Sequence, residues 1–193
     1  MKLLRRAFLL AAPLTLTLGC GRFHGLDLGL LTPLDNFHTV EAGKLYRSAQ
    51  LGKHTLKAVC QKMGIRTVVN LRGQNSGSSW YDDESACCAA IGVKLVNIPM
   101  ESDEMPTREA MLELWDTFEN GEYPMLVHCK AGADRTGGAV AIWRMMEGES
   151  RQAAARELSA AYGHSQVMYP EWDWLLGMFR PSREWIEHDY PVQ

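Results

Sequence analysis

Short apolar runs alternate along the chain with segments in which apolar residues recur every three or four positions. One such segment places four apolar residues on a single helical face, at i, i+3, i+4 and i+7: Leu56, Val59, Cys60 and Met63. Gly64 follows as a C-terminal stop signal. Directly after it, residues 65–71 (IRTVVNL) form a β-branched run, which predicts a strand buried on both faces.

The same alternation continues to about residue 162. It predicts strands over residues 44–47, 93–98 and 124–128, and helices over residues 81–91, 111–118, 139–147 and 150–162. Strands separated by helices of this length imply βαβ crossovers. We therefore expect an α/β fold with a small, mostly parallel central sheet and helices on both faces. Ligands bind beyond the carboxyl ends of the strands in such sheets, so the residues after 124–128 are the first candidates for a site.

The first 19 residues carry the pattern of a targeting signal. Three basic residues precede a short apolar run at residues 7–18, which is too short to span a bilayer comfortably. The pair Arg5-Arg6 resembles a twin-arginine export signal, and an ordinary secretory signal is the alternative. The end of the run resembles a bacterial lipobox, in which Cys20 is lipidated and becomes the first residue; simple cleavage nearby is the alternative.

These features divide the chain into three parts. We expect residues 1–19 to be a signal peptide, residues 20–35 a tether and residues 36–193 a single domain of ordinary size. The protein is then expected to be exported, to the periplasm or cell envelope of a bacterium. A lipid on Cys20 would hold it on a membrane face.

Composition and charge narrow the function classes. With 46% hydrophobic and 22% charged residues, the chain has the composition of a globular domain with a real core. Its formal net charge is −3, and it becomes −6 once residues 1–19, which carry three basic residues and no acidic one, are removed. Such a chain has no strong overall field for nucleic acid, so we expect no nucleic-acid partner. Any anionic substrate must be attracted by a local site.

The five cysteines are too few and too irregularly spaced for a disulfide scaffold, and no CxxC pair is present to suggest structural zinc. We expect no metal and no other cofactor. Cys87 and Cys88 are expected to fill the core. A disulfide from Cys60 to one of them is the alternative in an oxidising compartment.

Residues 128–137 (HCKAGADRTG), directly after the last predicted strand, combine a nucleophile with an anion trap. A glycine-containing loop that closes onto a helix start can turn successive backbone N–H groups toward one point. These donors and the helix dipole favour a bound anion, and they favour the thiolate form of Cys129. Arg135 can bond two phosphoryl oxygens at once and stays charged. Thr136 can give a hydroxyl proton to the thiolate when the thiolate leaves.

This segment resembles the signature of the cysteine-dependent protein tyrosine phosphatase superfamily, His-Cys-x-x-Gly-x-x-Arg-Ser/Thr. The resemblance covers about residues 36–163. Residues 36–37, 43–50 and 64–72 look like the opening of small dual-specificity-type phosphatases, including exported bacterial members, and Ile98-Pro99 and the Ala-rich helix after Ser150 also resemble that group. It implies a dual-specificity phosphatase-like fold, Cys129 as nucleophile, Arg135 as phosphate-binding residue and a phosphocysteine intermediate without a metal. The other substrate-binding residues that it implies lie in the same loop: Lys130, Ala131, Gly132, Ala133, Asp134 and Thr136.

A general acid is expected, because expelling a phenolate or an alkoxide requires a proton from a nearby carboxyl. In the resembling family this acid follows the strand before the third crossover helix, which is the loop 99–106 here. The spacing Pro-x-x-x-Asp of the exported bacterial members favours Asp103. Glu101, Glu104 and Asp134 are the alternative acids. If Asp103 has no catalytic role, it is expected to be a helix N-terminal cap or a solvated charge of the loop.

The resemblance implies hydrolysis of phosphotyrosine, and also of phosphoserine or phosphothreonine, in proteins, or of small phosphate esters. With Lys130 after the cysteine, the segment also resembles that of the phosphoinositide phosphatases, which use lysines there to meet additional phosphates. Ala133 stands where those enzymes have a second lysine, so inositol phosphates remain an alternative substrate class. A non-catalytic phospho-binding module and a rhodanese-type sulfur-transfer enzyme are rival classes. The presence of both Cys129 and Arg135 argues against a phospho-binding module without catalysis. The rhodanese-type loop does not require the Arg135-Thr136 ending that this chain has, which makes that class the more distant alternative.

The remaining conspicuous residues are expected to serve the fold. Arg47 and Arg72 recur in the resembling openings, where a structural ion pair is expected and substrate contact is the alternative. Glu157 is assigned to a solvated helical face, and His164 to the surface or a helix end. The tryptophans of the tail are expected to pack on the domain: Trp172, Trp174 and Trp185.

Overall fold

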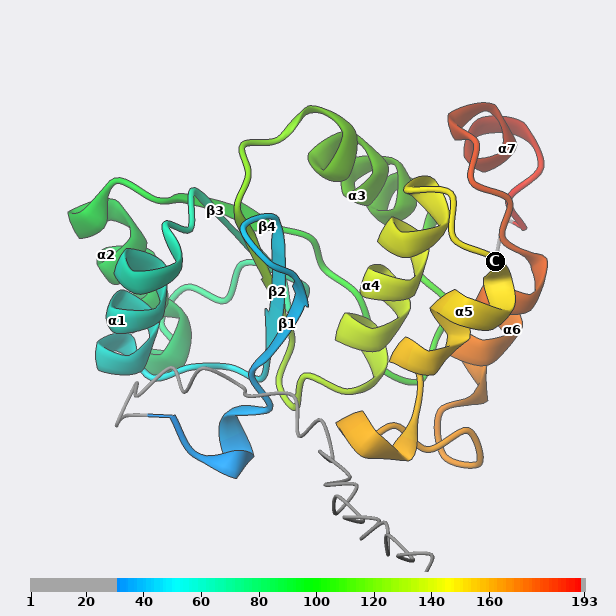
Figure 1. The fold of residues 1–193 in the computed structure, drawn as a ribbon. Coiled ribbons are helices and arrows are strands. Elements are labelled where there is room, and N and C mark those ends of the chain that lie inside the picture. Colours follow the sequence, from blue (N-terminus) through cyan, green and yellow to red (C-terminus); the bar gives the residue numbers. More distant parts are fainter. Residues whose placement is uncertain (1–30, 192–193) are drawn as a thin grey trace, which may run out of the picture.

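The computed structural model describes residues 31–191, so the predicted signal peptide and Cys20 lie outside the described residues. The strands are β1 (His38–Glu41), β2 (Leu45–Ser48), β3 (Thr67–Asn70), β4 (Lys94–Asn97) and β5 (Met125–His128). They form one sheet in the order β1-β2-β5-β3-β4 (Figure 1). β1 runs antiparallel to β2, and all other neighbours are parallel. The predicted α/β fold with a mostly parallel sheet is thereby confirmed.

Helices cover both faces of the sheet (Figure 1). One face carries α1 (Lys53–Met63) and α2 (Ser79–Ile91). The other carries α3 (Arg108–Asn120) and α4 (Asp134–Met146), with α5 (Arg151–Ala154) and α6 (Pro170–Met178) packed on α4, and α7 (Arg183–His188) packed on α3. The 3₁₀ turns are η1 (Pro33–Asp35), η2 (Ala155–Glu157) and η3 (Ala160–Tyr162). Among residues 31–191, no helix has both the length and the hydropathy that crossing a membrane requires.

The central strands are buried on both faces, as the β-branched run predicts. Val69 and Val127 face the core that includes the apolar residues of α3 and α4. Their sequence neighbours Val68 and Leu126 face the smaller core under α1 and α2. Because side chains alternate between the faces of a strand, a slip of one residue would exchange the two cores, and the register is fixed accordingly.

Some elements differ from the sequence prediction. β1 is absent from the prediction because its four residues are mostly exposed and lack an apolar run. The helix predicted over residues 139–147 begins at Asp134 instead, since Gly138 hides the helical pattern. A Cβ on Gly138 would lie 2.0 Å from the ring of Trp172, so close packing requires glycine there. The single helix predicted over residues 150–162 is α5 followed by η2 and η3.

The described end of the predicted tether contacts the domain. The backbone carbonyl of Asp35 accepts a hydrogen bond from the backbone N–H of Ala49 at 2.7 Å.

Two of the three tail tryptophans pack on the domain as expected, since Trp172 and Trp185 are buried. The expectation is wrong for Trp174, which is 61% exposed on the outer face of α6.

Candidate active site

Cys129 lies at the edge of the sheet where the parallel strands end. It follows β5, the strand between β2 and β3, and is 2% exposed. Side chains and loops that follow the neighbouring strands meet beside it. Gln50, after β2, binds Arg72, after β3, and Arg135 binds the backbone of the loop 99–106, after β4. The loops that carry the predicted site residues therefore meet where a ligand of such a sheet is expected.

The loop after Cys129 turns its backbone N–H groups toward one side. Three successive carbonyls accept hydrogen bonds from the surrounding structure: Lys130 O from Gln50 N at 3.2 Å, Ala131 O from Asn36 Nδ2 at 3.0 Å, and Gly132 O from Arg47 Nη2 at 2.8 Å. In a trans peptide the N–H points away from the C=O. The N–H groups of Ala131, Gly132 and Ala133 consequently point away from these partners, which is the orientation that an anion-binding loop requires.

The sulfur of Cys129 lies within reach of one of these donors. The N–H of Gly132 donates to Cys129 Sγ at 3.3 Å, and α4 begins at Asp134, so the positive end of its dipole faces the loop. Gly132 has a φ of 70°, and a Cβ there would lie 2.6 Å from Ala49 N. The sharp turn that brings Gly132 to the sulfur therefore depends on glycine.

A buried ion pair supports the loop from the side of the sheet. Arg47 is fully buried, and its Nη1 lies 2.5 Å from Glu157 Oε2. Glu157 also accepts from Arg144 Nε at 2.6 Å. Burial lowers the pKa of Arg47, and the nearby Glu157 carboxylate opposes that effect. The structural ion pair expected for Arg47 is confirmed, whereas the expected solvated position of Glu157 is wrong because two arginines enclose its carboxylate.

Arg135 uses one nitrogen of its guanidinium to hold the loop 99–106. Its Nη1 donates to Met100 O at 3.1 Å, while its Nε is buried without a partner among the described residues. The Nε–Nη2 edge is the one that binds two phosphoryl oxygens side by side. Thr136 Oγ1 is likewise buried and unpartnered among the described residues, next to this arginine. Buried donors of this kind are costly unless a ligand or the reacting sulfur uses them.

Arg72 lies on the rim of the site, and among the described residues its guanidinium contacts Trp80 and Gln50 rather than a carboxylate. Its guanidinium stacks on the ring of Trp80 at 3.3 Å from the centroid and donates to Gln50 Oε1 at 2.9 Å. Burial lowers the pKa of Arg72, and the positive charge of Arg135 lowers it further. The expected ion pair is therefore wrong for Arg72, which brings a second guanidinium near Arg135. Lys130 is exposed on the same rim.

The candidate acids fall into two environments. Glu101, Asp103 and Glu104 are exposed on the loop 99–106. Asp134 is buried, and its Oδ1 lies 2.7 Å from His164 Nδ1. Asp103 as the acid stays a prediction.

Within residues 31–191, no group of three or more His, Cys, Asp or Glu side chains is placed to hold a metal ion.

His164 is a residue that the sequence prediction misplaces. It is buried, and its two ring nitrogens lie 2.7 Å from Asp134 Oδ1 and 2.8 Å from Asp173 Oδ2. Glu84 is also missed: it is buried on α2, with Oε1 2.9 Å from Nε2 of His128, the residue before the candidate nucleophile. Both are single polar residues whose partners are distant in sequence, so no local pattern marks them.

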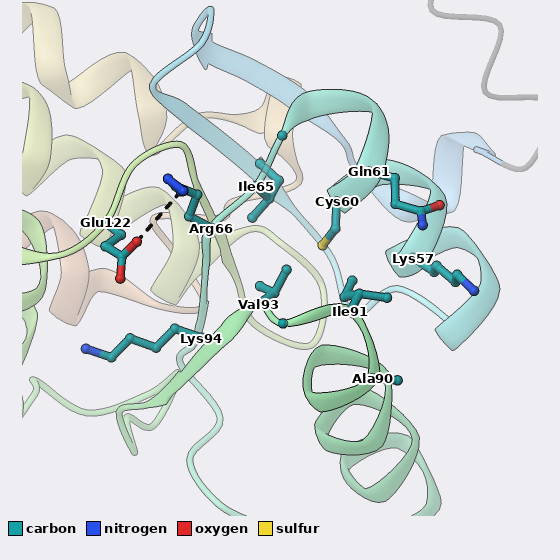
Figure 2. A pocket seen from close by; sticks show the side chains of 12 residues that line it. Lys57, Cys60, Gln61, Ile65, Arg66, Ala90, Ile91, Val93, Lys94 and Glu122 are labelled. Atoms are coloured by element: carbon teal, nitrogen blue, oxygen red, sulfur yellow. Dashed lines mark ion pairs between the residues drawn. The ribbon is translucent and has the colours of Figure 1, made fainter.

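A cavity of about 610 Å³ lies elsewhere, where β3 and β4 begin. Figure 2 shows Lys57, Arg66 and Lys94 around it, with Arg66 paired to Glu122 at 3.7 Å. It is at the opposite edge of the sheet from Cys129 and contains none of the predicted site residues. Cys60 also lines it.

The other described cysteines do not compete with Cys129. Cys60, Cys87 and Cys88 are free thiols, so none of them forms the alternative disulfide in this structure. Burial raises the pKa of Cys60 to about 12, and it also raises that of Cys88. These thiols stay protonated at neutral pH and are poor nucleophiles.

Comparison with known proteins places the chain among phosphatases. Residues 34–171 match the family model described as DSP-PTPase phosphatase fused to NAD+ Kinase. The chain is 32% identical over 116 residues to the dual specificity protein phosphatase TpbA of Pseudomonas aeruginosa strain UCBPP-PA14, covering 59% of this chain and 49% of TpbA. The chain thus spans about half the length of the curated relatives that it matches.

Solved structures share the fold. A crystal structure of P. aeruginosa TpbA has a TM-score of 0.64 at 22% identity, covering 82% of this chain and 94% of that one. The core catalytic domain of the PP-IP phosphatase SIW14 from S. cerevisiae, in complex with citrate, has a TM-score of 0.64 at 18% identity, covering 84% and 99%. With the family model matched across the strands, the Cys129 loop and α4, this chain belongs to the DSP-PTPase phosphatase family, within the cysteine-dependent protein tyrosine phosphatase superfamily.

Proposed function

We propose that the protein hydrolyses phosphate monoesters through a phosphocysteine intermediate on Cys129. The observation that carries this proposal is the loop in which three successive carbonyls are bound by the surrounding structure, while the N–H of Gly132 donates to the Cys129 sulfur. Such a loop fits a phosphoryl group with three equatorial oxygens. The family to which the chain belongs supports the same activity.

The reaction takes place in two steps. The phosphoryl oxygens bind the loop N–H groups and the Nε–Nη2 edge of Arg135. In the first step Cys129 Sγ attacks phosphorus, so that the S–P bond forms and the ester P–O bond breaks. Asp103 protonates the leaving oxygen. A water molecule then attacks phosphorus and gives its proton to the Asp103 carboxylate. The S–P bond breaks, and Thr136 donates a hydrogen bond to the departing thiolate.

Phosphotyrosine in proteins is the substrate class that we favour. A crystal structure of the related TpbA is a complex with pTyr, and the exposed rim beside Cys129 suits a protruding aryl phosphate. A phosphorylated small molecule is the second candidate, because the guanidinium of Arg72 and the exposed Lys130 offer charge for additional phosphates. The structural relative SIW14 is a PP-IP phosphatase. Turnover measured on phosphotyrosine peptides, phosphoserine peptides and inositol phosphates distinguishes these classes.

Asp103→Asn should slow the hydrolysis of phosphotyrosine by about 100-fold or more, because the phenolate then leaves without a proton. A substrate with a low-pKa leaving group, such as p-nitrophenyl phosphate, should lose far less. The alkaline limb of the kcat profile should also flatten, since the group that must be protonated is gone. Steady-state kinetics on the two substrates across pH check this expectation.

Glu104→Gln is compared with Asp103→Asn, because it neutralises an exposed neighbour on the same loop that is itself an alternative acid. It should leave the ratio of the two substrates unchanged. If Asp103→Asn behaves like wild type while Asp134→Asn shows both effects, the acid is Asp134 and the assignment to the loop 99–106 is wrong.

We also propose that the protein is exported and that Cys20 carries a lipid that holds the domain on a membrane face. The support is the charged and apolar pattern of residues 1–19 followed by Cys20. Mature protein from cells should begin at Cys20, carry acyl groups by mass spectrometry and sediment with membranes. A mature form cleaved at another residue and recovered without acyl groups contradicts lipidation, and a full-length cytosolic form contradicts export as well.

A further inference from the structure

We propose that residues 164–178, which comprise His164 and α6, form a brace that ties the phosphate-binding loop to the loop 99–106, and that Trp172 is a positioning residue for proton transfer. The proposal rests on the proposed function, since it concerns the alignment of the candidate acid loop with Cys129.

One end of the brace holds the phosphate-binding loop. His164 is buried, with Nδ1 at 2.7 Å from Asp134 Oδ1 and Nε2 at 2.8 Å from Asp173 Oδ2. Asp134 directly precedes Arg135, and Asp173 lies in the first turn of α6. The imidazole thus links the start of α4 to the start of α6. Movement of α6 would be transmitted to the residue next to the phosphate-binding arginine.

The other end of the brace holds the loop 99–106. Trp172 is 1% exposed, and its Nε1 donates to Ser102 O at 3.1 Å. Its ring packs on Gly138 of α4, where a Cβ would approach to 2.0 Å. Ser102 is the residue before Asp103. The indole therefore fixes the backbone from which the candidate acid projects, and it does so against the helix that follows the phosphate-binding loop.

The loop 99–106 is also held near both of its ends. Arg135 Nη1 donates to Met100 O at 3.1 Å, and the buried hydroxyl of Tyr190 donates to Pro106 O at 2.6 Å. Of these three contacts, only that of Trp172 acts within one residue of Asp103. Its loss should leave the loop attached at both ends while the acid moves, and a misplacement of about 1 Å can cost on the order of 100-fold in rate.

Trp172→Phe removes the indole N–H but keeps an aromatic ring against Gly138. It should lower kcat for phosphotyrosine by about tenfold or more while changing kcat for p-nitrophenyl phosphate by less than about threefold, because only the first substrate depends strongly on a placed proton. Vanadate affinity, which reports on the phosphate-binding loop, should stay as in wild type. Trp174→Phe, the same substitution at the exposed tryptophan two residues on, is the matched control and should change neither substrate.

A double variant separates positioning from general loosening. Trp172→Phe added to Asp103→Asn should cost little beyond Asp103→Asn alone, because both act on one proton transfer. Asp173→Asn, which weakens the brace at its other end and keeps the side-chain shape, should give the same substrate-dependent loss, and it serves as the test if Trp172→Phe does not fold. Equal losses on both substrates, or no loss on either, would overturn the proposal. A wild-type protein without phosphatase activity would instead reject the proposed function itself.

Discussion

Cys129→Ser should abolish turnover while phosphate and vanadate still bind. The hydroxyl of serine is a far poorer nucleophile than a thiolate, so the S–P bond of the first step has no substitute. The loop N–H groups and the guanidinium of Arg135 stay in place, because the carbonyls that orient the loop are bound by Gln50, Asn36 and Arg47 rather than by the sulfur. Turnover of p-nitrophenyl phosphate and calorimetric titration with vanadate measure the two properties separately.

Cys87→Ser is the control for this variant. Cys87 is a half-buried free thiol on α2, and its replacement should leave turnover unchanged. Residual activity of Cys129→Ser within tenfold of wild type would show that another group is the nucleophile. Wild-type activity that resists both vanadate and iodoacetate would lead to the same conclusion.

Arg135→Lys should lower kcat/KM by about 2–4 kcal/mol, which is roughly 30- to 1,000-fold. Lysine keeps the charge but lacks the planar fork, so it cannot supply the Nε–Nη2 edge that faces the phosphoryl oxygens. The loss should appear in vanadate affinity as well as in kcat, because the fork contacts the phosphoryl group in both the ground and the transition state.

Arg66→Lys makes the same change on a side chain that is 59% exposed and lies at the opposite edge of the sheet. It should leave kcat/KM and vanadate affinity as they are. If Arg135→Lys were equally silent, the arginine would serve only to hold Met100 O, which an ammonium group can also do.

The part of the fold that the sequence predicts is the part with local periodicity. The run at residues 65–71 is buried on both faces as β3, and α1 ends at Gly64, whose φ of 66° is the left-handed conformation of a helix stop. The loop after Cys129 is equally local, since its chemistry lies within ten consecutive residues. Its position at the carboxyl edge follows from the parallel sheet.

The parts that sequence patterns miss depend on contacts between distant residues. Glu157 lies 110 residues from Arg47. The sequence around Glu157 reads as a solvated helical face, so nothing local marks it as a buried carboxylate. His164 gains its role only because α6 returns to the start of α4. Trp172 is recognisable as core material, but its bond to Ser102 O requires the folded arrangement of two segments 70 residues apart.

Trapping the covalent intermediate tests the central claim most directly. Wild-type protein is mixed with an aryl phosphate whose phosphoryl group is radiolabelled, quenched in acid within the first turnover, and digested for mass spectrometry. We expect the phosphoryl group on the peptide that contains Cys129, and none on the peptides of Cys60, Cys87 or Cys88 or in Cys129→Ser. Turnover that proceeds with no label on Cys129, or with the label on another residue, would contradict the phosphocysteine mechanism.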